Sequence, residues 1–236
     1  MIRPDPAGAR VALYWAPEVS DPLHALGSAW LGRDAESGAT LRQPEVPGLD
    51  LFEATRDPRR YGLHGTLKPP FRLAPGTTYA ALRADAAALA ARTPPFPLPP
   101  LRPVDHGGYL ALREAAPDPD LHAFADDCVR AVDAHRAPPT AGEVAKRRPE
   151  ALTPAQRENL DRWGYPWVFG DFAFHVTLSR RLTSEEMRAA LPAAEAHLGA
   201  AAGVPRTVRE LCLFAQAAPD APFLVAERLP LGGAAV

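Results

Sequence analysis

Apolar and polar residues alternate with a period of two in two stretches that lie far apart in the chain. In residues 61–73, which read YGLHGTLKPPFRL, the alternation places His64, Thr66 and Lys68 on one side. Side chains of a strand point alternately to its two faces. This stretch therefore predicts a strand with one face that is small or apolar and one face that carries reactive groups.

The second stretch, residues 172–182, repeats this pattern in the sequence FAFHVTLSRRL. His175, Thr177 and Ser179 share one face, and aromatic or aliphatic residues occupy the other. A single His-x-Thr triplet is weak evidence, because such triplets often arise by chance. Two copies that both continue with Leu, HGTL and HVTL, indicate a paired function.

Helical periodicity and capping residues predict most of the remaining elements. Asp21 followed by Pro22 starts one helix, and Thr183 with Glu186 three residues later forms a capping box before another. Further helices are expected over about 77–92, 119–136 and 153–164. Strands are expected over 9–17, in a hairpin around the turn DHGG at 105–108, and over 207–216 and 223–231.

The order of these elements predicts an α+β fold in which a similar pattern occurs about twice, with one motif strand in each half. We expect a single bilobal domain over residues 1–236, with mostly antiparallel sheets, flanking helices and a lobe boundary near 93–118. The motif strands, at about 61–73 and 172–182, would face a cleft between the lobes, where ligands usually bind. The sequence leaves open whether the polar connection at 136–152 closes over this cleft.

Composition excludes some classes of function. The 236 residues carry a formal charge of -2 with a pI near 6.4, so overall charge gives no reason to expect binding to nucleic acid or membranes. The chain starts without the features of a signal peptide, and no apolar run approaches the roughly 18 residues of a membrane span. We therefore expect a cytoplasmic protein. Cys128 and Cys212 predict buried thiols rather than a disulfide or a zinc site.

The two motifs favour acid–base chemistry without a metal or cofactor. Each His-x-Thr strand supplies one imidazole, and no Cys pair or His-Glu-x-x-His motif accompanies it. The 17 glycines form neither GxGxxG nor GxxxxGKS/T, so no nucleoside triphosphate site is expected. With an unperturbed pKa of about 6.5, one imidazole can be neutral while the other is protonated, as the base and the acid of one reaction require.

The tetrapeptides HGTL and HVTL resemble the paired signatures of the two-histidine (2H) phosphoesterase superfamily, whose members include RNA 2′,3′-cyclic phosphodiesterases and ligase-like proteins. The longer stretches RRYGLHGTLKPPFRL and LTPAQRENLDRWGYPWVFGDFAFHVTLS resemble a branch encoded beside phosphonate-utilisation genes. The resemblance implies a bilobal fold with a four-stranded sheet in each lobe and both motifs facing a central cleft.

We therefore expect a metal-independent cyclic phosphodiesterase with His64 and His175 as general acid and base. Thr66 and Thr177 would hydrogen-bond the non-bridging oxygens of the phosphate as negative charge grows. Which histidine is the acid depends on how the substrate is oriented. The other histidines, His106 among them, lie in helix or turn patterns without such companions and are expected to be structural.

Further residues are candidates for contacts with an anionic substrate. The first choices are Lys68, Ser179, Tyr61, Arg56 and Arg181. Arg60 and the basic run at 146–148 are additional candidates, because phosphates are commonly held by cationic side chains. Aromatic residues at 165 and 167 are candidates for stacking on a base or sugar, with core packing as the alternative.

The resemblance to the phosphonate-associated branch implies a small ribose cyclic phosphate as substrate. The acidic pI agrees with a small phosphorylated partner rather than with long RNA. Two other interpretations stay open: an enzyme that opens 2′,3′-cyclic phosphates at RNA ends, and a non-catalytic module that binds a phosphorylated metabolite or an RNA end. The oligomeric state is also open.

Overall fold

Nine strands and eight α-helices make up the described part of the chain, residues 9–232 of the computed structural model. The strands are β1 (Arg10–Trp15), β2 (Gly65–Arg72), β3 (Phe96–Leu98), β4 (Leu101–His106), β5 (Tyr109–Glu114), β6 (Val176–Arg181), β7 (Arg206–Val208), β8 (Glu210–Gln216) and β9 (Leu224–Pro230). Seven of them form one sheet in the order β4-β5-β6-β2-β1-β8-β9. The pairs along this sheet are antiparallel, as the α+β prediction requires.

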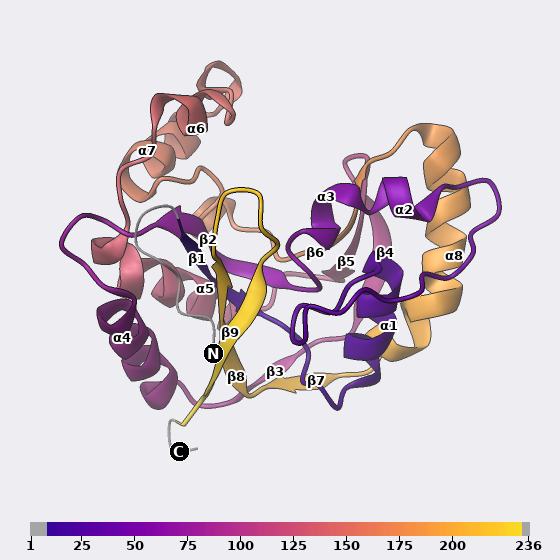
Figure 1. Cartoon of the computed structure of the whole chain (residues 1–236), viewed down its shortest axis with the longest axis horizontal. Coiled ribbons are helices and arrows are strands. Elements are labelled where there is room, and N and C mark those ends of the chain that lie inside the picture. Colours follow the sequence, from indigo (N-terminus) through magenta and orange to yellow (C-terminus); the bar gives the residue numbers. More distant parts are fainter. Residues whose placement is uncertain (1–8, 233–236) are drawn as a thin grey trace.

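Helices flank the sheet (Figure 1). They are α1 (Pro22–Leu31), α2 (Leu51–Ala54), α3 (Arg56–Arg59), α4 (Tyr79–Arg92), α5 (Pro119–Val132), α6 (Ala141–Ala145), α7 (Pro154–Trp163) and α8 (Ser184–Ala202). Short 3-10 turns follow or precede them at Asp133–His135, Pro149–Ala151 and Phe169–Asp171.

Side-chain caps fix where the helices begin, and the sequence identifies them. The Asp21 carboxylate accepts a hydrogen bond from the Leu23 backbone N–H, with Pro22 in the first turn of α1. Thr183 and Glu186 form the predicted capping box before α8. These bonds satisfy backbone N–H groups that have no partner inside the helix.

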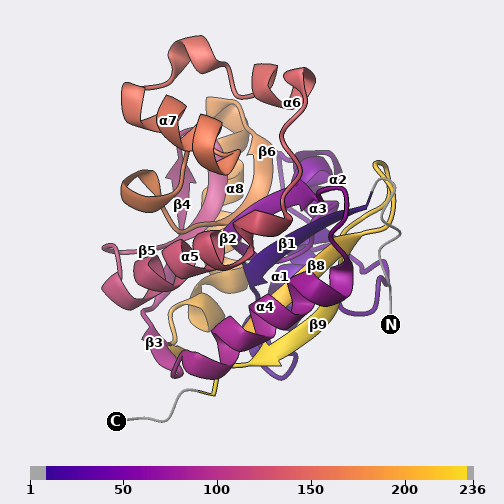
Figure 2. The same ribbon diagram turned by 90° about the vertical axis from the view of Figure 1, so that its left-hand side faces the viewer.

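The four long helices cover one face of the sheet and divide it into two halves. Helices α4 and α5 pack together on the half made of β2, β1, β8 and β9, and Figure 2 shows them side by side in front of these strands. Helices α1 and α8 pack on the half made of β4, β5 and β6. One half therefore takes its helices from the middle of the chain and the other takes them from near its two ends. One buried cluster runs beneath all four helices.

The two halves of the sheet meet at a narrow join. Strands β2 and β6 are in register at a single pair, Gly65 with Val176. By contrast, β2 pairs with β1 over most of its length, and β6 pairs with β5. Because both motif strands begin at this pair, the sheet brings the tetrapeptides HGTL and HVTL together at its centre.

The proline-rich segment near 93–118 is mostly strand. It contains β3, β4 and β5, and β3 forms a separate two-stranded ribbon with β7. Pro97 lies in this ribbon, where a strand has a free edge that tolerates a missing N–H donor. This segment connects α4 to β4, which is an edge strand of the seven-stranded sheet. In residues 9–232, no helix combines the length and the apolar character needed to span a membrane.

Candidate active site

The four residues of the doubled motif flank the join of the sheet. With Gly65 opposite Val176, antiparallel alternation places His64 and Thr66 on the same face as His175 and Thr177. Gly65 and Val176 themselves are buried against the helical face. His64 and His175 are diagonal neighbours across this strand pair. In a regular ladder the Cα atoms of such neighbours lie about 7–8 Å apart, which leaves room for a phosphate between the two imidazoles.

The ring of His64 is held by its own backbone. Its Nδ1 lies 2.8 Å from the carbonyl oxygen of Gly62. Gly62 has a φ of +82°, and a side chain there would collide with Ala35, so only glycine fits this turn before β2. A carbonyl only accepts, so Nδ1 of His64 carries the hydrogen and Nε2 of the neutral ring keeps its lone pair.

His175 repeats this arrangement. Its Nδ1 lies 2.8 Å from the carbonyl oxygen of Ala173, again two residues earlier in the chain. Both imidazoles are therefore set with Nδ1 as donor and with Nε2 available for proton transfer. The predicted strands start later than expected, since β2 and β6 begin one residue after each histidine.

Gly65 lets the two motif segments approach closely. A Cβ at this position would lie 2.3 Å from the ring of Phe174, the residue before His175. Phe174 is fully buried and packs edge-on against Trp15 at a centroid distance of 5.8 Å. The absence of a side chain at Gly65 therefore allows the aromatic residue of one motif to sit beneath the other motif.

His64 lies in an aromatic surrounding. Its ring stacks on Tyr14 of β1 with the centroids 3.9 Å apart, and Tyr61 and Phe214 lie at 5.9 and 6.1 Å. Burial lowers the pKa of His64 to about 4; positive charge on His175 adds to this effect, and the bond to Gly62 opposes it. His64 is therefore neutral at pH 7.

His175 lies among polar and charged groups. His106 of β4 is 5.0 Å away between ring centroids, and Nη1 of Arg113 in β5 donates to Nδ1 of His106 at 3.3 Å. The β5–β6 register ends at Leu112 with Val176. Arg113 and His175 are therefore the next residues of the two segments, on the same face as Ala111 and Thr177. Burial lowers the pKa of His175, the Arg113 charge adds to this, and the Ala173 bond opposes it.

The Arg113 side chain is incompletely satisfied. Its Nε is buried and has no hydrogen-bond partner in the described part of the chain. Because Arg113 donates to Nδ1 of His106, the other nitrogen of that neutral ring carries a hydrogen and is a donor. Burial, His175 and Arg113 together lower the pKa of His106. The side of the site next to His175 thus offers donors to an anion.

Two of the expected substrate contacts have protein partners instead. Lys68 is 1% exposed, and its ammonium lies 2.7 Å from the carboxylate of Asp133. Ser179 is buried, accepts from the Leu110 N–H at 2.9 Å and donates to the Arg180 carbonyl at 2.7 Å. These contacts do not bring Lys68 or Ser179 to the motif histidines.

The remaining expected contacts are spread over the molecule. Tyr61 lies near His64 and stacks on Phe223 with the centroids 5.1 Å apart. Arg56 is exposed and paired with Glu53 at 2.8 Å. Arg181, at the end of β6, lies over the ring of Tyr109 at 5.1 Å. Of these three, only Tyr61 is beside a motif histidine.

The sequence did not identify Tyr14, His106 and Arg113 as site residues. Tyr14 sits in an apolar strand, where it reads as a core residue. His106 was expected to be structural because it adjoins a turn, and the structure places it beside His175 instead. Strand register is the signal that connects His106 and Arg113 with the second motif. The hairpin pairs His106 of β4 with Tyr109 of β5, and the pairing of β5 with β6 then fixes the position of Arg113 relative to β6.

Within residues 9–232, no group of three or more His, Cys, Asp or Glu side chains is arranged to hold a metal ion. Cys128 and Cys212 are buried and free, as the sequence predicts.

Solved structures similar to this one include E. coli LigT and a protein described as a phosphoesterase. A crystal structure of E. coli LigT complexed with 3′-AMP is 13% identical, covers 97% of this chain and 99% of that chain, and has a TM-score of 0.44. A crystal structure described as a phosphoesterase is 14% identical over 95% of this chain and 99% of that one, with a TM-score of 0.43.

Two curated relatives are similar in sequence. A protein of Janthinobacterium sp. (strain Marseille) named ribose 1,5-bisphosphate phosphokinase PhnN is 37% identical over 95% of this chain and 51% of its own length. A protein of the same name from Laribacter hongkongensis (strain HLHK9) is 36% identical over 91% of this chain and 50% of its own length. The chain thus spans about half the length of the curated relatives it matches.

A family described as "Protein of unknown function (DUF1045)" matches residues 66–224, which is more than half of the chain. The matched range contains Thr66 and the whole second motif. The protein therefore belongs to the DUF1045 family.

Proposed function

We propose that the protein is a 2H phosphoesterase that opens a small cyclic phosphate to a phosphomonoester. The observation that carries this proposal is the geometry at the join of the sheet. His64 and His175 face the same side from one registered strand pair. Both have Nδ1 bound to a carbonyl, and within residues 9–232 neither Nε2 has a hydrogen-bond partner. A phosphate between two such rings has a base on one side and an acid on the other.

The surroundings of the two histidines support a division of roles. Burial holds the pKa of His64 at about 4, so its ring is neutral at pH 7. It takes a proton from water, whose oxygen forms the new P–O bond. His175 in its protonated form gives its proton to the ring alkoxide as the old P–O bond breaks. A bound phosphate anion stabilises that protonated form.

The non-bridging oxygens need donors as negative charge grows on them. Thr66 and Thr177 are half-buried on the same face as the histidines, one on each side of the join. On the His175 side, Arg113 and His106 extend this set. In this proposal no step uses a metal ion.

The names of the curated relatives suggest the substrate class. The half of each relative that lies outside the matched region is the candidate for the phosphokinase activity, because this chain has no GxxxxGKS/T motif to hold a triphosphate. Such a kinase uses ribose 1,5-bisphosphate. Cleavage of a 1,2-cyclic phosphate of ribose 5-phosphate at the 2-oxygen produces that compound. A ribose cyclic phosphate is therefore the proposed substrate.

The proposal is tested by phosphorus NMR on the purified protein in excess EDTA. The substrates are a ribose 1,2-cyclic phosphate and 2′,3′-cyclic nucleotides, offered together. We expect the ribose cyclic ester to be converted to a monoester, with conversion lost in His64→Ala and in His175→Ala. Turnover that disappears only with EDTA contradicts the metal-independent mechanism.

A series of cyclic-phosphate oligonucleotides provides the comparison with RNA. If kcat/KM rises with chain length and exceeds that of the ribose ester, the protein is an RNA-end enzyme. If no ester is converted by folded protein, and ribose cyclic phosphate still raises the melting temperature, the protein is a binding module rather than an enzyme.

A further inference from the structure

Two adjoining cavities lie beside the candidate active site, between the sheet and the α6–α7 segment. One has a volume of about 520 Å³ and the other of about 340 Å³. They share five lining residues from four parts of the chain: Arg10, Tyr61, Arg72, Glu143 and Lys146. We call the combined space the basic cleft. The connection at 136–152 contributes one of its walls.

The basic cleft concentrates positive charge in a chain whose formal net charge is -2. Three anionic residues line it: Asp57, Glu143 and Asp220. Seven cationic residues line it: Arg10, Arg60, Lys68, Arg72, Arg136, Lys146 and Arg147. A concave surface lined mainly by one sign of charge attracts ligands of the opposite sign.

Some of these cations are already neutralised. Arg72 is paired with Glu143 at 3.0 Å, and Lys68 and Arg136 both contact Asp133. Their charges contribute little to binding a ligand.

Three other cations keep their charge available. Arg10 donates to the neutral side chain of Gln216 at 2.7 Å. Within residues 9–232, Lys146 and Arg147 have no ion pair, and Arg147 lies over the ring of Tyr165 at 4.7 Å. The cleft therefore holds three cations without a carboxylate partner, enough to match the double charge of a phosphomonoester.

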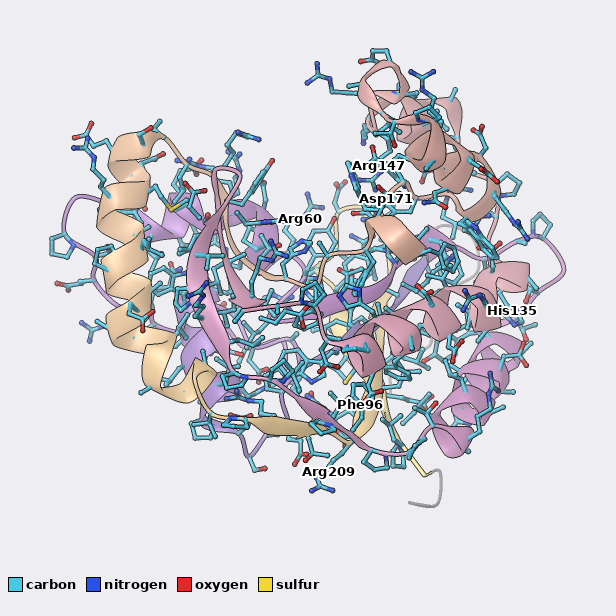
Figure 3. All side chains as sticks on the ribbon, turned by 180° about the vertical axis from the view of Figure 1, so that it is seen from behind. Arg60, Phe96, His135, Arg147, Asp171 and Arg209 are labelled. Carbon is cyan, nitrogen blue, oxygen red and sulfur yellow. The ribbon has the colours of Figure 1, made fainter. Side chains whose placement is uncertain are left out.

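The basic cleft is close to the catalytic histidines. Tyr61 lines both cavities, and its ring centroid is 5.9 Å from that of His64. Arg10 shares a face of β1 with Tyr14, whose ring stacks on His64. In Figure 3, Arg147 extends from the α6–α7 segment and Arg60 lies on the opposite side of the opening. Tyr61 thus borders both the basic cleft and the ring of His64.

We propose that the basic cleft binds a second phosphate of the same substrate, a phosphomonoester joined through the sugar to the cyclic phosphate. This inference rests on the proposed function, because the cyclic phosphate must lie at His64 and His175. It narrows the substrate class to sugar cyclic phosphates that carry a terminal phosphomonoester. Lys146, Arg147 and Arg10 provide the charge, and Tyr61 borders the sugar.

The test compares ribose 1,2-cyclic phosphate with and without a 5-phosphate. We expect the 5-phosphate to raise kcat/KM by about tenfold to a hundredfold, mainly through KM. In the Lys146→Ala/Arg147→Ala double variant, the ratio of the two kcat/KM values should fall toward one. The matched control is Arg148→Ala, because Arg148 adjoins this pair but does not line the cleft. Its ratio should match that of the wild type.

The result separates this inference from the proposed function. If both esters are opened by a His64-dependent reaction at equal kcat/KM, the inference is wrong and the proposed function stands. If the variants lower turnover of cyclic-phosphate oligonucleotides in proportion to chain length, the cleft binds RNA diesters and the inference is also wrong.

If neither ester is opened, calorimetry with ribose 5-phosphate still decides the inference. Binding that is lost in Lys146→Ala/Arg147→Ala and kept in Arg148→Ala supports a phosphomonoester site. The absence of binding to the wild-type protein overturns it.

Discussion

The two motif segments share a backbone arrangement and differ in what surrounds them. In both, the imidazole Nδ1 is 2.8 Å from the carbonyl two residues earlier. His64 then lies against the aromatic rings of β1 and β8, whereas His175 lies beside Arg113 and His106 of β5 and β4. The comparison teaches that the motif fixes the tautomer and the neighbouring strands fix the pKa.

This difference follows from the position of each strand in the sheet. Strand β2 has β1 as its other neighbour, and β6 has β5. The same four-residue pattern therefore has aromatic rings beside its histidine in one half of the sheet, and has Arg113 and His106 beside its histidine in the other half. The two imidazoles are held in the same way but have different surroundings, which act on their pKa values differently. An acid and a base of one reaction require such a difference.

The largest effect tests whether the two histidines have different roles. His64→Gln and His175→Gln should each lower kcat/KM on the ribose cyclic ester by about a thousandfold, because each removes a proton-transfer group. On an aryl phosphodiester, whose leaving phenolate needs no proton, His175→Gln should lose far less than His64→Gln. Equal losses on the aryl ester would mean that the two roles are not divided in this way.

A smaller effect concerns the cost of burying His64. Its pKa is about 4 in the folded protein and about 6.5 when unfolded, so unfolding is accompanied by proton uptake below neutral pH. The stabilisation from the neutral ring is complete above pH 6.5 and is lost as pH falls toward 4, by about 3 kcal/mol. In urea unfolding, the free energy of unfolding of His64→Gln should fall correspondingly less between pH 7 and pH 4 than that of the wild type. An identical pH dependence in both proteins would show that His64 is not desolvated.

The next effect concerns the join between the segments. Gly65→Ala should lower the free energy of unfolding by about 2 kcal/mol, because the new Cβ meets the Phe174 ring. Adding Phe174→Leu should recover part of the loss, which would demonstrate coupling. The control is Gly142→Ala in α6, where no atom lies within 4 Å of the added Cβ. Thermal melts that shift equally for Gly65→Ala and Gly142→Ala would contradict close packing at the join.

The smallest effect concerns the charged surroundings of His175. Arg113→Gln should lower kcat/KM by about tenfold, because it removes a cation beside the phosphate. It should also raise the pKa of His175, because Arg113 holds that pKa down. The basic limb of the kcat/KM profile then moves to higher pH. Arg181→Gln, a change at the end of β6, is the control and should leave this limb in place.

Much of the fold could be predicted from local patterns. The caps at Asp21 and Thr183, the hairpin at 105–108 and the helix with Leu121 and Cys128 on its buried side are properties of short segments. The two motif strands were also predicted, because their alternation of apolar and polar residues is local. A cap or an alternating strand is determined by contacts within a few residues, which the sequence displays directly.

Lys68 shows where the strand pattern was insufficient. Simple alternation assigned its side chain to the same face as that of His64. In the structure, the register of β2 against β1 shifts between Tyr14 and Leu13, and Lys68 is buried beside Asp133. An irregular register changes which way later side chains point, and it depends on the partner strand. No pattern within residues 61–73 contains that information.

By itself, the sequence determined the α+β class and most helix starts, and it singled out His64, Thr66, His175 and Thr177 as candidate site residues. These follow from periodicity, capping and a repeated tetrapeptide. Only the tertiary structure decided that one strand pair brings the two motifs together, that Arg113 and His106 stand beside His175, and that a basic cleft adjoins His64. The reason is that strand order and register are set by packing between segments more than a hundred residues apart, and local sequence carries no signal for that packing.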